Sequence, residues 1–259
     1  MTTDPTPLDP LDPLDPAPAP ASPNGPAPAN ARAQARAGAA AAVNAPGAAG
    51  GAPRTTAVAF TLVATLAVFA ACTALVLGHG TGFIDRPALS EAVAHRDALL
   101  DGPMKVVTHA SKYPLLIVTA LGAGFASWRG RSWRPLLLVG GVGALSVAVA
   151  TLAKETTDRT RPPAAFWAIP EEGWCFPSRH TVIATAVLLM LAYVFTARIA
   201  SRAARLAVWT GALLLAALVG ASRVYLGVHW ATDALAGLAL GAAVMLAMVT
   251  ADVWLRRRE

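Results

Sequence analysis

The sequence predicts an all-α protein: a six-transmembrane-helix bundle preceded by a disordered N-terminal tail. Its composition supports this class, because 55% of the 259 residues are hydrophobic and only 14% are charged, whereas a soluble domain carries about 25% charged residues. The mean hydropathy is +0.51. Long apolar segments recur from residue 56 onward, and three short polar clusters lie at the ends of such segments.

The N-terminal segment has a different composition. Pro-Leu-Asp repeats at residues 7–9, 10–12 and 13–15, and a stretch rich in proline, alanine and glycine follows. Such a segment cannot bury enough apolar surface to offset the entropy of ordering. We therefore expect a disordered tail over residues 1–55 and one membrane domain over residues 56–259.

Six apolar segments are expected to cross the bilayer. A helix rises about 1.5 Å per residue and the hydrocarbon core is about 30 Å thick, so about twenty residues span it. Some of the segments reach this length only with flanking residues. The predicted spans are 56–78, 113–128, 135–153, 181–197, 206–221 and 233–254.

The loops between the spans predict the orientation. The connections 129–134 and 198–205 and the tail 256–258 are short and rich in arginine, whereas the alternate loops carry both signs of charge. Basic residues favour cytoplasmic loops. We therefore expect a multi-pass protein of the cell membrane with both termini in the cytoplasm and all three polar clusters on the extracytoplasmic side.

The loop 79–112 contains one segment with helical periodicity. Apolar residues recur at helical spacing from Pro87 to Leu100, and proline suits a first helical turn. We expect one amphipathic helix that lies at the outer membrane interface.

Charge and cysteine content exclude other classes. The net charge of +6 is explained by arginines that flank the spans, and no basic stripe with interleaved aromatics indicates nucleic-acid binding. Two cysteines make no disulfide framework. Cys72 is expected in the core, and Cys175 is expected to be a bystander because no neighbouring residue marks it as a nucleophile.

The third polar cluster contains Ser222, Arg223, His229 and Asp233. The i, i+4 spacing of His229 and Asp233 places them on one helical face if the last span begins there. A carboxylate that accepts a hydrogen bond from one ring nitrogen leaves the other nitrogen free to attack an electrophile. The alternative is a His–Asp pair that only caps a helix.

The second cluster is Pro177-Ser178-Arg179-His180. Ser178 is a candidate N-cap residue of the fourth span, and a helix N-terminus attracts anions. His180 would then lie where a leaving oxygen needs a proton. The alternative is an ordinary interfacial histidine.

The first cluster runs from Lys154 to Pro162. Lys154, Asp158 and Arg161 recur at helical spacing, so that Lys154 and Arg161 are expected on one side of a helix that Pro162 stops. The alternative is a solvated helix end with snorkelling side chains. Cations and two imidazoles on one membrane face favour phosphate ester chemistry, because ionisable residues beside a bilayer are usually functional.

Three motifs occur in order across the spans: Lys-x6-Arg-Pro (154–162), Pro-Ser-x-His (177–180) and Ser-Arg-x5-His-x3-Asp (222–233). With these motifs the region 56–254 resembles the type-2 phosphatidic acid phosphatase family of lipid phosphate phosphatases, which belongs with the vanadium haloperoxidases and bacterial acid phosphatases. The resemblance implies a helical-bundle core and metal-independent hydrolysis through a phosphohistidine, with no cofactor.

The resemblance also implies roles for individual residues. His229 would be the nucleophile, Asp233 would orient it, and His180 would protonate the leaving group and later activate water. Lys154, Arg161, Ser178 and Arg223 would bind the phosphate oxygens. Arg179 departs from the family pattern, which usually has glycine there. Its extra charge could contact a second phosphate or narrow the pocket.

The implied activity is the hydrolysis of a lipid phosphate monoester or diphosphate, with a membrane lipid and the bilayer as partners. Undecaprenyl diphosphate, phosphatidic acid and phosphatidylglycerol phosphate all fit an interfacial site. A haloperoxidase is disfavoured by the six spans. The other alternative is a non-catalytic phosphatase-like membrane transporter or scaffold, since charges in membranes also mark substrate paths. No sequence feature indicates an oligomeric state.

Overall fold

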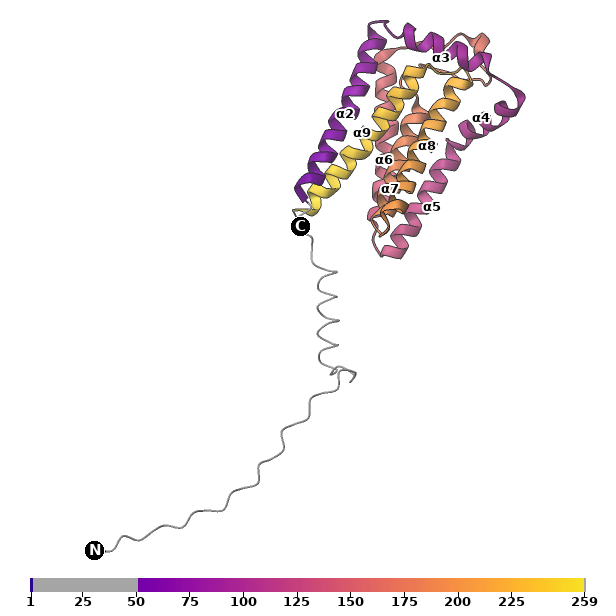
Figure 1. Cartoon of the computed structure of the whole chain (residues 1–259). Helices are drawn as coiled ribbons and strands as arrows, with labels where there is room; N and C mark the ends of the chain where they lie inside the picture. Colours follow the sequence, from indigo (N-terminus) through magenta and orange to yellow (C-terminus); the bar gives the residue numbers. More distant parts are fainter. Residues whose placement is uncertain (2–50, 259) are drawn as a thin grey trace. The chain divides into compact units, whose positions relative to one another are not determined.

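The computed structural model describes Met1 and residues 51–258, and of residues 51–55 it describes only the backbone. The expected disordered segment 1–55 therefore lies almost entirely outside the described residues. Within residues 51–258 the chain forms helices and no strands, which confirms the all-α class. The elements in Figure 1 are α2 (Gly51–Leu77), α3 (Gly82–Ala94), α4 (Ala98–Ala110), α5 (Tyr113–Gly130), α6 (Arg134–Thr157), the 3-10 helix η1 (Ala164–Phe166), α7 (Arg179–Thr196), α8 (Arg202–Tyr225) and α9 (Ala231–Arg256).

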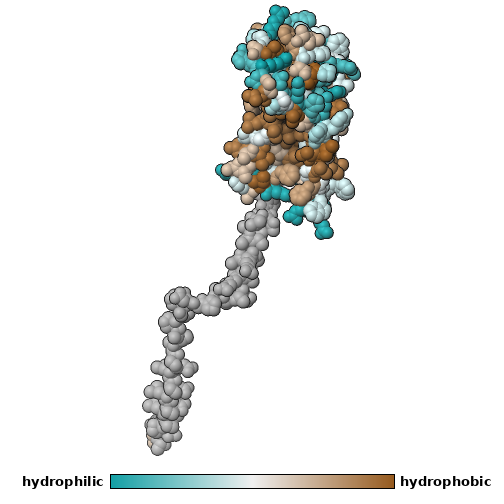
Figure 2. Space-filling view, turned by 90° about the vertical axis from the view of Figure 1, so that its right-hand side faces the viewer, coloured by the Kyte–Doolittle hydropathy of each residue, from teal (hydrophilic) through white to brown (hydrophobic). Residues whose placement is uncertain are grey.

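Five helices of the described part are long and apolar enough to cross a membrane. They comprise Thr56–Leu77 of α2 and the whole of α6, α7, α8 and α9. Figure 2 shows apolar residues around the middle of the helical part and hydrophilic residues gathered at the end that carries α3. This distribution matches a bundle whose flanks face hydrocarbon and whose ends reach water.

The second expected span is the helix α5, but it is not among these five. Its C-terminal turn contains Ser127, Trp128 and Arg129, which lower its hydropathy. Even so, Ile117, Val118 and Leu121 are exposed on α5 by 58–68%. An apolar face exposed to this extent suits contact with lipid better than contact with water.

The loop between the first two spans forms two helices, α3 and α4, so the expectation of a single helix over 87–100 was wrong. The chain turns at His95 and Arg96, and Asp97 caps α4: its carboxylate accepts hydrogen bonds from the backbone N–H groups of Leu99 (2.7 Å) and Leu100 (3.0 Å). The apolar periodicity continues across this break, which is why it suggested one helix.

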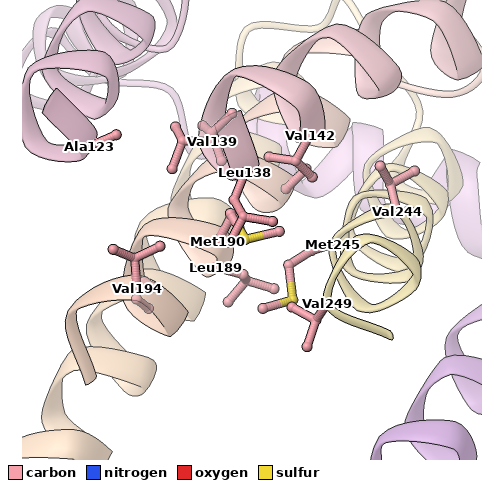
Figure 3. Close-up of a cluster of buried hydrophobic side chains, with 14 of the residues drawn as sticks. Ala123, Leu138, Val139, Val142, Leu189, Met190, Val194, Val244, Met245 and Val249 are labelled. Carbon is pink, nitrogen blue, oxygen red and sulfur yellow. The ribbon is translucent and has the colours of Figure 1, made fainter. Parts of the chain in front are cut away.

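Helix α7 is the centre of the bundle. It packs against α5, α6, α8 and α9, and most of its apolar segment is buried, whereas that of α2 is almost entirely exposed. Figure 3 shows the core that results, in which Leu189 and Met190 of α7 meet Val142 of α6 and Met245 of α9.

Two glycines allow α9 to approach α7 closely. A Cβ atom on Gly237 would lie 2.8 Å from Cβ of Thr181, and one on Gly241 would lie 2.5 Å from the backbone oxygen of Val182. Small residues four positions apart are a common device for close helix packing in membranes. The close approach brings the N-terminal ends of α7 and α9 together, where the N–H of Ser178 donates to the carbonyl oxygen of Asp233 at 3.1 Å.

Candidate active site

A polar pocket of about 150 Å³ opens where α6 ends and α7 and α9 begin. Residues from the first and second polar clusters, the loop 171–174 and the segment before α9 surround it. The lining residues are Lys154, Arg161, Glu171, Glu172, Gly173, Trp174, Arg179, His180 and His229. Both predicted histidines thus face one cavity, although 49 residues separate them in the sequence.

His229 is buried and held at both ring nitrogens. Its Nδ1 lies 3.2 Å from Oδ2 of Asp233, and its Nε2 lies 3.2 Å from Nη1 of Arg161. A carboxylate accepts and a guanidinium donates, so the two contacts agree on one tautomer, with the proton on Nδ1 and the lone pair on Nε2. Burial lowers the pKa of His229 to about 4, despite the opposing effect of Asp233. The ring is therefore neutral near pH 7.

The contact between His229 and Asp233 does not come from a shared helical face, because α9 begins only at Ala231. Asp233 instead reaches back from the first turn, and its Oδ2 also accepts the backbone N–H of Trp230 at 2.9 Å. The Asp233 carboxylate therefore does both things considered in the sequence analysis: it caps the start of α9 and it accepts a hydrogen bond from His229.

Arg159 is a component that the sequence analysis did not single out. Its guanidinium donates to Oδ1 of Asp233 and, at 2.7 Å, to Oγ1 of Thr232 on one side. On the other side it donates to Oδ2 of Asp85 and, at 2.9 Å, to Oγ1 of Thr81. Burial works against its charge, but Asp233 and Asp85 outweigh this and raise the pKa of Arg159.

Asp85 completes this network from α3. It is 2% exposed and accepts the N–H of Thr232 at 2.9 Å and the hydroxyl of Thr232 at 3.0 Å. The interfacial helix α3 is therefore tied to the residue that orients His229. The sequence offered two signals for this network. One is Asp85, a carboxylate beside apolar neighbours, and the other is Arg159, a second arginine two residues before Arg161.

Arg161 reaches the pocket from a loop. Helix α6 ends at Thr157, and Asp158 adopts a left-handed conformation with φ of 44°, so the expected helical spacing of Lys154, Asp158 and Arg161 was wrong. Lys154 and Arg161 nevertheless line one pocket. Carbonyl oxygens hold the guanidinium in place, those of Gly173 (2.9 Å), Glu172 (2.8 Å) and Val228 (2.7 Å).

The remaining cations of the pocket are Lys154 and Arg179. The Lys154 ammonium donates to the carbonyl oxygen of Trp174, which lies on the same loop that holds Arg161. Arg179 is the first residue of α7, and its side chain is exposed at the pocket edge. The pocket is therefore positive on several sides and open to solvent.

Arg223 lies behind the pocket and is wholly buried. Its Nη2 donates to Oε2 of Glu171, whereas Nε and Nη1 have no hydrogen-bond partner in the described part of the chain. Leaving buried donors of a charged group unpaired is costly. An anion beside Glu171 would satisfy them.

Glu171 is a second component that the sequence analysis missed. It lies on the pocket wall and pairs with Arg223 across 52 residues of sequence. Burial alone would raise its pKa, but Arg223 and then Arg161 outweigh this and lower the pKa of Glu171 to about 2. In this structure a carboxylate thus occupies the anion position beside Arg223.

Ser178 and His180 begin α7 and differ in position. Ser178 is the N-cap residue, but its side chain makes no capping bond; its buried Oγ accepts from Oγ1 of Thr181 at 3.0 Å. It does not line the pocket. His180, in the first turn, is half buried and lines both this pocket and a neighbouring groove.

That groove has a volume of about 470 Å³ and shares Glu171, Arg179 and His180 with the pocket. Its other walls come from α5, α6 and α7, where Leu116, Val147 and Ile183 are apolar. An amphiphile can therefore place its polar group beside His180 and its apolar part against these helices.

Neither cysteine has a catalytic environment. Both thiols are free and buried, and Sγ of Cys175 donates to the carbonyl oxygen of Thr160 at 3.2 Å. Burial, and then the charge of Asp233, raises the pKa of the Cys175 thiol. A protonated, buried thiol is a poor nucleophile, which agrees with the expected bystander role.

Comparison with known proteins gives consistent relatives. The PAP2 superfamily model matches residues 135–257, a region that contains all three polar clusters. Phosphatidylglycerophosphatase B of Bacillus subtilis is 35% identical over 161 residues, which cover 61% of this chain and 77% of that protein. Decaprenylphosphoryl-5-phosphoribose phosphatase of Mycobacterium tuberculosis is 32% identical over 171 residues, 61% of this chain and 87% of that protein.

Two solved structures share the architecture. A transmembrane PAP2-type phosphatidylglycerolphosphate phosphatase from Bacillus subtilis has a TM-score of 0.68 and 27% identity, and the match covers 77% of this chain and all of that one. Aquifex aeolicus LpxE has a TM-score of 0.53 and 18% identity, with 64% of this chain and 94% of that chain covered. The second likeness concerns the fold alone.

Proposed function

Because this chain belongs to the PAP2 superfamily, we propose that it removes phosphate from a membrane lipid through a phosphohistidine formed on His229. The phosphatase class and the multi-pass membrane location follow from the family, its relatives and the spanning helices. The reaction path, the site residues and the substrate are the content of the proposal. We assign the membrane domain to residues 56–259.

One observation carries the proposal. The Nε2 lone pair of His229 faces a cationic pocket, while its Nδ1 is held by the buried carboxylate of Asp233. A neutral imidazole whose Nδ1 proton is held by a carboxylate is suited to attack phosphorus through Nε2, once the Arg161 donor moves from Nε2 to a phosphate oxygen. An imidazole that served only to cap α9 would not need a pocket lined by Lys154, Arg161 and a second histidine.

In the first step, Nε2 of His229 attacks phosphorus and the bond from phosphorus to the lipid oxygen breaks. His180 donates its proton to the departing oxygen, so that an alcohol or a lipid monophosphate leaves. Asp233 stabilises the positive charge that develops on the His229 ring. Arg159 and the N–H of Trp230 hold Asp233 in position for this role.

In the second step, neutral His180 takes a proton from water, and the water oxygen attacks phosphorus. The bond between phosphorus and Nε2 breaks, which releases inorganic phosphate and restores the His229 lone pair. The charges of Lys154, Arg161 and Arg223 offset the negative charge on the phosphate oxygens in both steps. Ser178, the N-cap residue of α7, is given no direct contact with phosphate in this path, because it does not line the pocket.

Arg223 supports an anionic substrate independently of the histidines. Its Nε and Nη1 are buried without partners in the described residues, and Glu171 pairs with its Nη2. Because Glu171 lies between Arg223 and the pocket, we assign these donors to a phosphate that displaces the Glu171 carboxylate. The described residues contain no group of three or more His, Cys, Asp or Glu side chains placed to hold a metal ion, and the proposal assigns no metal and no cofactor to the site.

The substrate class follows from the site and the relatives. The groove beside His180 has apolar walls on helices that cross the bilayer, which favours a lipid whose phosphate lies in the interface. The relatives are phosphatases of phosphatidylglycerophosphate and of decaprenylphosphoryl-5-phosphoribose by name. We therefore rank phosphatidylglycerol phosphate first, then phosphatidic acid and undecaprenyl diphosphate.

The orientation belongs to the same proposal. The end of the bundle opposite the pocket carries the arginine-rich connections and the tail 256–258. By the bias of basic residues toward the cytoplasm, both termini are cytoplasmic and the pocket opens on the extracytoplasmic side. The reaction would thus act on the outer leaflet.

The test is phosphate release from these three lipids by the purified protein, with and without EDTA. We expect release to persist in EDTA and to disappear in His229→Ala, and an acid-labile phosphoprotein to accumulate in His180→Ala. Release abolished by EDTA would contradict the metal-independent path. A fully active His229→Ala protein would remove the nucleophile assignment.

Arg179 carries the expectation about a second phosphate. Its exposed side chain lies at the pocket edge, where the outer phosphate of a diphosphate would project. We expect Arg179→Gly to reduce turnover of a diphosphate more than that of a monophosphate. Unchanged relative rates would remove the idea.

A further inference from the structure

A second polar pocket lies at the opposite end of the bundle, where α6 and α8 begin and α7 and α9 end. This is the end of the helical part at which the C-terminus lies in Figure 1. The pocket has a volume of about 520 Å³, and four of its lining residues are arginines: Arg134, Arg198, Arg205 and Arg256. It shares no residue with the candidate active site.

We call this second cavity, lined by Arg134, Arg198, Arg205 and Arg256, the inner pocket. Its positive charge is only partly neutralised within the described residues. Asp252 pairs with two of the arginines. Its Oδ1 accepts from Nε of Arg134 at 2.7 Å, and its Oδ2 lies 3.5 Å from Nε of Arg256. Among the described residues, the Arg198 side chain donates to the carbonyl oxygen of Ala126, at 3.3 Å, and has no ion-pair partner. Four arginines and one aspartate leave a net charge of three.

Arg205 is the arginine most available to a ligand. Its guanidinium lines the pocket but makes no hydrogen bond or ion pair with any residue that the structure describes. Arg134, by contrast, is fixed in the wall, because Asp252 and the hydroxyl of Tyr193 (3.4 Å) both contact it. The pocket thus combines a preformed cationic wall with a free guanidinium.

The bias of basic residues toward one membrane face explains why arginines occur at this end. It does not explain why four of them line one cavity with Tyr193 and Trp209. Other arginines at the same end, including Arg202 and Arg257, lie outside it. The convergence of four arginines on one cavity, rather than their charge alone, is the observation that supports a bound anion.

The outer surface of α8 supplies a path for hydrocarbon chains. Leu206, Trp209 and Leu213 lie on one face of this helix, at i, i+3 and i+7. Trp209 lines the pocket, and the two leucines are exposed by 68% and 51%. An anion in the pocket that carried acyl chains could lay them along this face, with the indole at the headgroup level.

We propose that this inner pocket binds the phosphate group of an anionic phospholipid in the leaflet opposite the candidate active site. The guanidinium fork matches phosphate oxygens in geometry and charge, and basic pockets between spanning helices suit anionic headgroups. The lipid would act as a resident structural ligand that bridges the ends of α6, α7, α8 and α9.

The test compares two single variants of the full chain in detergent micelles. Arg205→Gln removes the free pocket charge, and Arg257→Gln is its match, because it removes the same charge at the same end outside the pocket. Neither side chain has a described hydrogen-bond or ion-pair partner, so both variants should fold. Thermal unfolding is followed while phosphatidylglycerol, phosphatidylcholine or inorganic phosphate is added.

We expect phosphatidylglycerol to raise the unfolding temperature of the wild type and of Arg257→Gln at similar concentrations. Arg205→Gln should need about tenfold more lipid for the same rise, the effect of one lost charged hydrogen bond. Equal responses of the two variants would overturn the site in favour of diffuse surface charge. If phosphatidylcholine raised the unfolding temperature as much as phosphatidylglycerol, the site would not require an anionic headgroup. If inorganic phosphate protected the protein equally well, the ligand would not need to be a lipid.

Discussion

The tie between α3 and the candidate nucleophile can be broken by one atom exchange, Asp85→Asn. Asp85 lies outside the pocket, and its carboxylate accepts from Arg159 and from the N–H and hydroxyl of Thr232. An asparagine has one side-chain oxygen, so if that oxygen accepts from Thr232, the amide N–H₂ faces Arg159; in the flipped orientation Arg159 meets only a neutral oxygen. The buried guanidinium is then left with Asp233 as its one anionic partner in the described part of the chain.

The magnitude follows from these contacts. Removing one partner of a buried ion pair costs about 3–5 kcal/mol, and we expect the lower end because Arg159 keeps Asp233. For catalysis, the loss of a hydrogen bond between charged groups that positions Asp233 corresponds to about 1.5–3 kcal/mol. That is roughly a 10- to 150-fold fall in kcat, with KM unchanged because Asp85 does not line the pocket.

The assay measures kcat and KM for phosphate release together with thermal unfolding in the same micelles. Asp101→Asn is the matched control: Asp101 lies on α4, accepts the hydroxyl of Tyr225 at 2.9 Å and has no contact with Arg159. We expect this control to keep its kcat. The measured rates are corrected for the fraction of protein that is folded. A fall in kcat that remains after this correction, at constant KM, indicates loss of positioning rather than loss of folded protein.

A folded Asp85→Asn protein with kcat within twofold of the wild type would refute the reasoning. So would a rise in KM at constant kcat, since it would place Asp85 among the residues that bind substrate. Either result would reduce the network to a structural tie between α3 and α9.

Three further outcomes are expected. The pKa of His229 lies at about 4, below its ordinary 6.5, so the neutral, nucleophilic ring persists to low pH. The acid limb of the kcat/KM profile that belongs to His229 should therefore fall near pH 4. A limb near pH 6.5 would contradict the buried, neutral ring. By linkage the same shift contributes stability above pH 6.5 that is lost as the pH falls toward 4, because the unfolded chain takes up this proton first. Gly241→Ala should destabilise the protein by about 1–3 kcal/mol through overpacking against Val182. The control Gly211→Ala on α8 adds a methyl group with no heavy atom within 4 Å and should not lower the unfolding temperature. Equal effects of the two variants would argue against close packing of α9 on α7. Glu171→Gln should leave Arg223 without its anionic partner and tighten inhibition by inorganic phosphate about tenfold; unchanged inhibition would show that Glu171 does not compete for the phosphate position.

Much of this protein could be predicted from local pattern. Helices in a membrane must satisfy their own backbone hydrogen bonds, so apolar length alone indicates them, and five of the six predicted spans meet that criterion in the structure. The three motifs identified the pocket residues His180, His229, Lys154 and Arg161, because their spacing within each cluster is short and characteristic.

The sequence could not predict how Arg161 reaches the pocket or what holds it there. Its position depends on the left-handed turn at Asp158 and on carbonyl oxygens of a loop without secondary structure. Backbone acceptors are present at every residue, so no side-chain pattern marks them. The break between α3 and α4 was missed for a different reason: the apolar periodicity continues across it, although the side chain of Asp97 caps α4.

The sequence by itself determined the membrane class, the helices and which polar residues lie at helix ends, since these depend on neighbours within a few turns. Only the tertiary structure decided the pairs Arg159–Asp85 and Arg223–Glu171, whose partners are 74 and 52 residues apart, and the gathering of four arginines from three helices and the α7–α8 connection into the inner pocket. Such contacts depend on how close the helices pack, and that distance is set by small residues such as Gly237 and Gly241 where α9 crosses α7.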